Sequence, residues 1–124
     1  MFSHVIVGTN DLARARKFYD ATMSALGYGP AMDGGHRFFY MGGGVAFGVT
    51  TPINGEPATP SNGFTLGLAV QSPEQADAWH AAGIANGGTA CEDPPGVREG
   101  PMGKLYLAYL KDPDGNKLCA FLRM

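Results

Sequence analysis

His4–Gly27 reads HVIVGTNDLARARKFYDATMSALG, and Thr65–Gly88, sixty-one residues later, reads TLGLAVQSPEQADAWHAAGIANGG. The two stretches align without a gap, and Phe18 in the first falls on Trp79 in the second. Each begins with apolar residues typical of a strand and continues at helical spacing to a glycine. The repeat therefore predicts two copies of one module that starts with a strand followed by a helix.

Further strands are expected behind each helix, which gives each module the order β-α-β-β-β. Asp11 and its two preceding residues, and Ser72 followed by Pro73, offer helix N-caps. In the first module we predict strands over 2–8, 37–41 and 45–51, with a short one within 28–35. In the second we predict strands over 64–70, 89–92, 105–111 and 117–123, a loop over 93–104 and a turn over 112–116.

The length of 124 residues fits one domain of the α+β class. Residues 52–63 (PINGEPATPSNG) hold three prolines and two glycines and are predicted to be a linker. The expected division is module one at 1–51, linker at 52–63 and module two at 64–124 within a single domain, 1–124.

Charge and hydropathy make nucleic-acid-binding and membrane-spanning functions unexpected for this chain. The net charge is −2 and no basic stripe is present, so nucleic acid is not an expected partner. No segment approaches the ~20 apolar residues of a membrane span, and no leader pattern precedes the first strand, so we expect a cytoplasmic protein without a membrane partner. Cys91 and Cys119 are expected to be free thiols.

Three features together point to a known family: paired βαβββ modules, a first-strand His4 followed by TNDLARARKFYD, and a DPDGN turn at Asp112–Asn116 before the last strand. The chain resembles the glyoxalase/bleomycin-resistance/dioxygenase group, also called the vicinal oxygen chelate (VOC) superfamily. The resemblance implies two modules that form a cup-shaped curved mixed sheet with helices outside, commonly in a homodimer.

The resemblance also implies a metal site, with His on the first strand of a module and Glu on the last strand. His4 matches the first ligand, Thr65 stands at the second His, and Cys119 stands where Glu usually follows the DPDGN turn. The equivalent point in the first module is Phe47. A catalytic divalent ion needs about three protein ligands, so we expect a degenerate site and no cofactor. Zn²⁺ or another divalent metal on His4 and Cys119 is the alternative.

Strand alternation predicts which side chains line the cup. Val5 and Val7 are expected beneath the helix, whereas Phe2, His4 and Ile6 are expected on the opposite face. Tyr106 and Tyr109 should face opposite sides of their strand, one of them toward the cup. The predicted ligand-binding residues are Phe2, His4, Ile6, Phe47, Thr65, Gly67, Tyr106, Tyr109, Cys119 and Phe121.

The first functional hypothesis is a binder of a small apolar or aromatic molecule, with His4, Thr65 and Cys119 converging on one hollow. The second is an enzyme, a glyoxalase-type lyase or isomerase or a dioxygenase-type member, with His4 and Cys119 as catalytic or metal-holding residues. The third is a non-catalytic interaction protein whose cup is filled by its own side chains. The sequence leaves open whether the modules pair within one chain or between two chains of a homodimer.

Overall fold

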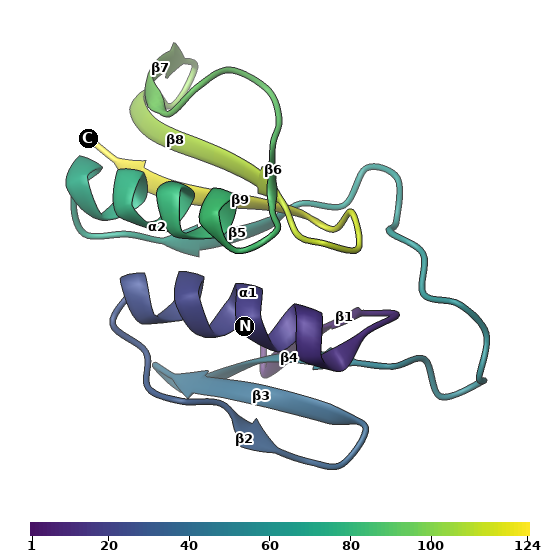
Figure 1. Cartoon of the computed structure of the whole chain (residues 1–124). Coiled ribbons are helices and arrows are strands. Elements are labelled where there is room, and N and C mark those ends of the chain that lie inside the picture. Colours follow the sequence, from purple (N-terminus) through teal and green to yellow (C-terminus); the bar gives the residue numbers. More distant parts are fainter.

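The computed structural model describes all 124 residues, as two helices and nine strands in two mixed sheets that are not closed on each other (Figure 1). The α+β class and the module repeat are confirmed. Module one contains β1 (His4–Gly8), α1 (Leu12–Ala25), β2 (Met32–Asp33), β3 (Arg37–Gly42) and β4 (Val45–Thr50). Module two contains β5 (Leu66–Ala69), α2 (Pro73–Ala85), β6 (Thr89–Ala90), β7 (Gly96–Gly100), β8 (Gly103–Lys111) and β9 (Lys117–Arg123).

Both helices begin where the sequence predicts. The Asp11 side chain accepts a hydrogen bond of 3.0 Å from the Arg14 backbone N–H at the start of α1. Ser72 accepts one of 3.1 Å from the Gln75 N–H at the start of α2. Each cap satisfies an N–H that has no partner inside its helix.

The sheets repeat one topology. The first sheet has the order β1-β4-β3-β2, and the second has the order β5-β9-β8-β6, with β7 paired to β8. In each module the first strand lies parallel to the last, and the remaining pairs are antiparallel. The prediction of a loop over 93–104 is wrong in part. Residues 96–100 form β7, and Gly103, at a φ of 93°, ends the tight turn into β8.

The helix-facing sides of the two sheets form one core. Trp79, Tyr19 and Phe18 are the largest fully buried aromatic side chains, and all three come from the helices. Phe47 belongs to this core, because its ring lies 5.0 Å from that of Tyr19 beneath α1. The prediction that Phe47 lines the ligand site is therefore not supported by its position. The register pairs it with Val5, the strand residue that we expected beneath the helix.

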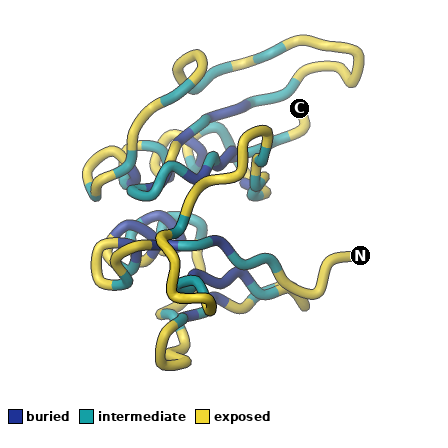
Figure 2. The backbone as a smooth tube through the Cα atoms, turned by 90° about the vertical axis from the view of Figure 1, so that its right-hand side faces the viewer, coloured by how far each residue is buried: buried dark blue, intermediate teal, exposed yellow.

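The modules meet through their helices. Figure 1 shows α1 and α2 side by side, and a Cβ atom added to Gly83 of α2 would lie 3.2 Å from the Phe18 ring of α1. The two sheets share no hydrogen bond, so they do not meet edge to edge within one chain. The linker between them is exposed along most of its length (Figure 2). Neither helix is long and apolar enough to cross a membrane.

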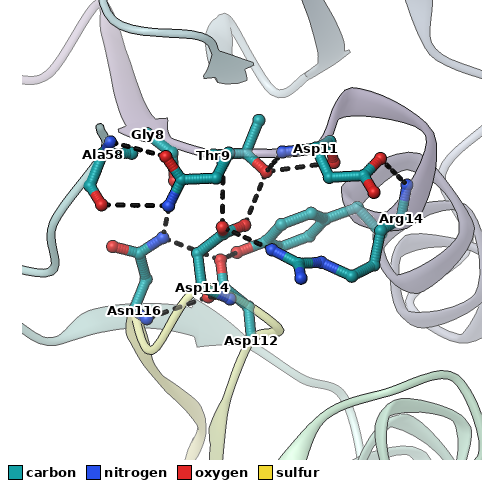
Figure 3. A network of polar contacts seen from close by, with 10 residues as sticks. Gly8, Thr9, Asp11, Arg14, Ala58, Asp112, Asp114 and Asn116 are labelled. Carbon is teal, nitrogen blue, oxygen red and sulfur yellow. Dashed lines mark hydrogen bonds and ion pairs between the residues drawn. The ribbon is translucent and has the colours of Figure 1, made fainter. Parts of the chain in front are cut away.

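The turn between β8 and β9 adds a second contact between the modules (Figure 3). The Asp114 carboxylate accepts hydrogen bonds from Thr9 Oγ1 (2.5 Å) and from a guanidinium N–H of Arg14 (2.7 Å). The Tyr19 hydroxyl donates to Asp112 at 2.6 Å, and Asn116 Nδ2 donates to the Gly8 carbonyl oxygen at 3.1 Å. The turn of module two is thereby fixed to the start of α1.

Candidate functional site

Each sheet has a face turned away from its helix, which we call its open face. On the first sheet, alternation and strand register place every second residue of each strand on open face A. Gly48 leaves space for its neighbour, since an added Cβ atom there would lie 2.6 Å from the Phe39 ring. The open face A residues are His4, Ile6, Gly8, Arg37, Phe39, Met41, Ala46, Gly48 and Thr50.

Open face B, on the second sheet, is built from three strands. The register places Gly67, Cys119 and Tyr109 in one row across β5, β9 and β8. No atom beyond the chain neighbours of Gly67 lies within 4 Å of a Cβ added to it, so the space above this glycine is empty. The open face B residues are Gly67, Ala69, Leu105, Leu107, Tyr109, Lys111, Lys117, Cys119, Phe121 and Arg123.

The two candidate tyrosines face opposite sides, as predicted. Tyr109 lies on open face B, whereas Tyr106 faces the helix side and its hydroxyl donates a 2.7 Å hydrogen bond to Asp77 of α2. Tyr106 therefore does not line open face B. Phe2 precedes β1 and is 68% exposed.

Within one chain, His4 does not meet the other two predicted site residues. His4 is exposed on open face A, and its Nδ1 lies 2.8 Å from Ser3 Oγ. Cys119 lies on open face B beside Gly67, and Thr65, in the segment that leads into β5, lines a hollow together with Lys117. The expectation that His4, Thr65 and Cys119 converge on one hollow is not met in the single chain, because the two sheets are separate.

The environment of Cys119 disfavours a thiolate. Burial raises the pKa of the Cys119 thiol, and burial also raises the pKa of the neighbouring Tyr109 hydroxyl. The Cys119 Sγ donates to the Ala120 carbonyl oxygen at 3.4 Å. A neutral buried thiol is a poor nucleophile and a poor metal ligand.

The donor set does not fit a divalent metal. No group of three or more His, Cys, Asp or Glu side chains that could hold an ion occurs in the chain. His4 has the methyl group of Ala46 opposite it, and Phe47 points into the core. Two ligands from different sheets, one of them a protonated thiol, fall short of the three that a catalytic site requires.

A hollow of about 520 Å³ lies at one end of open face B. Its charged residues are Lys111, Lys117 and Glu92, none of which the sequence reasoning selected. The pairing of the two lysines could have been predicted from the sequence, since they flank the DPDGN turn and a hairpin places the residues that flank its turn opposite each other. The lining residues are Pro60, Ser61, Asn62, Gly63, Phe64, Thr65, Cys91, Glu92, Lys111, Gly115 and Lys117.

Known proteins match this architecture. A crystal structure of a glyoxalase/bleomycin resistance protein from Albidiferax ferrireducens T118 has 65% sequence identity and a TM-score of 0.97, with 99% of each chain covered. A glyoxalase-related enzyme from Fulvimarina pelagi has 19% identity and a TM-score of 0.77, over 99% of this chain and 88% of that one. A putative glyoxalase from Bacillus halodurans has 20% identity and a TM-score of 0.78, over 98% and 94%.

No curated protein matches the chain. The family model described as Glyoxalase/Bleomycin resistance protein/Dioxygenase superfamily matches residues 1–120. This match covers both modules, and it agrees with the paired βαβββ modules and with the His4 on the first strand. The chain belongs to the glyoxalase/bleomycin resistance protein/dioxygenase superfamily.

Proposed function

We propose that this protein binds a small apolar or aromatic molecule, without a metal, between open face A of one chain and open face B of a second copy. The observation that carries the proposal is that each sheet has a face, with apolar side chains such as Met41 and Phe121 on it, that no other layer of the chain covers. Met41 on open face A is 58% exposed, and Phe2, which leads into β1, is 68% exposed. Large apolar side chains gathered on one exposed face are typical of an interaction surface.

A second copy is the partner that this arrangement favours. A sheet buries its apolar face against another layer, and here the helices already cover the other side of each sheet. Two-fold pairing would place open face A of each chain on open face B of the other, because such interfaces are self-complementary. The same pairing would bring His4 of one chain toward Cys119 of the other.

Open face B supports the binding of a ligand in such an interface. The empty space above Gly67 lies beside the Tyr109 ring and the Cys119 side chain. Binding sites for small molecules are concave and combine apolar walls with a few polar groups. Tyr109 supplies an apolar ring and a polar hydroxyl group. The empty space speaks against the alternative of a cup filled by its own side chains.

Fluorescence titration with N-phenyl-1-naphthylamine, a neutral aromatic probe, tests the proposal. The wild type should bind it, and Gly67→Leu should weaken binding about tenfold, which corresponds to ~1.4 kcal/mol, because the new side chain occupies the empty space. Ala81→Leu, on the exposed surface of α2, is the control and should bind like the wild type. Equal binding by the wild type and Gly67→Leu would refute the site.

Two further measurements separate the alternatives. Sedimentation velocity should give a dimer, and Met41→Asp should shift it toward monomer because the charge would be buried in the interface. Metal analysis of the purified protein addresses the enzyme alternative. Near-stoichiometric metal that is lost in His4→Ala would contradict a metal-free binder.

A further inference from the structure

The hollow at the end of open face B carries an unusual pair of like charges. Lys111 of β8 and Lys117 of β9 are direct register partners on the same face. Side chains paired in this way have Cβ atoms about 5 Å apart, and like charges there repel each other. An anion between the two ammonium groups would relieve that repulsion.

Glu92 neutralises only part of this charge. Its carboxylate forms an ion pair with the Lys117 ammonium group, whose nitrogen also lies 5.0 Å from the centre of the Tyr109 ring. Lys111 is exposed and has no ion-pair partner. With two lysines and one glutamate as its only charged residues, the lining of the hollow carries one net positive charge.

The backbone at Glu92 is a second, independent observation. Glu92 is the one residue other than glycine with a positive φ, at 57°. A side chain in this left-handed region is strained, and such strain concentrates at ligand sites, where the surrounding structure holds it. Here the strained position presents the carboxylate to Lys117.

The chemistry of open face B changes along its strands. The row of Lys111 and Lys117 is followed by a row of Gly67, Tyr109 and Cys119, and then by a row of Ala69, Leu107 and Phe121. Successive rows on one face are about 7 Å apart, since each residue advances ~3.4 Å. The surface therefore runs from cationic to apolar over the length of a small organic molecule.

We propose that the ligand is an amphipathic monoanion, such as an aromatic carboxylate. Its acidic group would lie between Lys111 and Lys117, and its apolar body would lie over Gly67 and Tyr109 toward Phe121. The inference rests on the proposed function and narrows the class of ligand.

Isothermal titration calorimetry with 2-naphthoate and 2-naphthamide tests the charge requirement, because the two probes differ chiefly in charge. The wild type should bind 2-naphthoate about tenfold more tightly than 2-naphthamide. Lys111→Met with Lys117→Met should bring the two affinities within about twofold. Lys104→Met, which removes an exposed lysine outside the hollow, should behave like the wild type.

Glu92→Gln gives a test in the opposite direction. Without the competing carboxylate, 2-naphthoate should bind about threefold or more tightly, while 2-naphthamide should change little. A wild type that prefers 2-naphthamide, or does not bind 2-naphthoate, would overturn the inference, as would weaker 2-naphthoate binding by Glu92→Gln. The proposed function would still stand if N-phenyl-1-naphthylamine binds and Gly67→Leu weakens it, so the two failures are distinguishable.

Discussion

Replacing Asp114 with alanine tests whether the polar contact at the β8–β9 turn stabilises the fold. The Asp114 side chain is 2% exposed, and its carboxylate accepts hydrogen bonds from Thr9 Oγ1, the Asn10 backbone N–H and the Arg14 guanidinium. All three donors belong to module one, whereas Asp114 belongs to module two. The substitution therefore removes three contacts between the modules at once.

The expected loss is smaller than three full charged hydrogen bonds, each of which contributes about 1.5–3 kcal/mol. The Arg14 side chain is 46% exposed, so water can replace the carboxylate as its partner. The Thr9 hydroxyl has a second acceptor, the Asp11 carbonyl oxygen, at 3.1 Å. We expect Asp114→Ala to lower the free energy of unfolding by about 2–3 kcal/mol, and Asp114→Asn by less, because the amide keeps one acceptor oxygen.

Asp33→Ala is the matched control. Arg16 contacts Asp33 at 2.7 Å, the same distance as Arg14 to Asp114, but the Asp33 side chain is 78% exposed. An exposed pair contributes at most about 1 kcal/mol. Urea unfolding followed by circular dichroism, at equal protein concentrations, measures both variants. A loss in Asp114→Ala no larger than that in Asp33→Ala would refute the reasoning.

Two further predictions concern packing and pH. An added Cβ atom at Gly83 would lie 2.3 Å from a Leu110 methyl group, so Gly83→Ala should lower the free energy of unfolding in urea by about 1–3 kcal/mol. The control is Gly67→Ala, whose Cβ atom meets no atom within 4 Å and which should change the free energy of unfolding by no more than about 0.5 kcal/mol. Burial lowers the pKa of His80 from its ordinary 6.5, so the folded state binds its proton less readily than the unfolded state. The contribution of His80 to the free energy of unfolding should therefore be complete above about pH 6.5 and be lost below it. Between about pH 7.5 and pH 5.5, the melting temperature should drop less in His80→Gln than in the wild type. An equal drop in both proteins would argue against this cause.

Local patterns in the sequence predicted most of the elements. The capping residues Asp11 and Ser72 fixed where the helices begin, since each cap depends on atoms three residues away. Residues 117–123 are a strand with the predicted bounds. Asp112 stabilises its own turn, because its Oδ1 accepts from the backbone N–H groups of Asp114 and Asn116, whereas the Asp114 side chain contacts module one.

Prediction and structure differ, or the prediction stays open, where a position depends on pairing between distant strands. The family pattern favours Phe47 as a ligand-site residue, but its register with Val5 places it in the core. The strand at 96–100 lies in a segment rich in glycine and proline, and its pairing with β8 stabilises it although its own residues do not favour a strand. The distance between His4 and Cys119 depends on how the two sheets are arranged relative to each other, and no local sequence pattern specifies that arrangement.

The contacts of the DPDGN turn connect the fold to the site. Asp112 and Asp114 bind Tyr19 and Arg14 of α1, and the same turn joins the strands that carry Lys111 and Lys117. Module one therefore fixes the place of the charged hollow through a buried carboxylate pair, even though no module-one strand lines it. Because the helix contact and this turn hold the modules together on the helix side, neither module covers the open face of the other. The residues that define the family pattern at this turn thus orient the two faces between which we propose that the ligand binds.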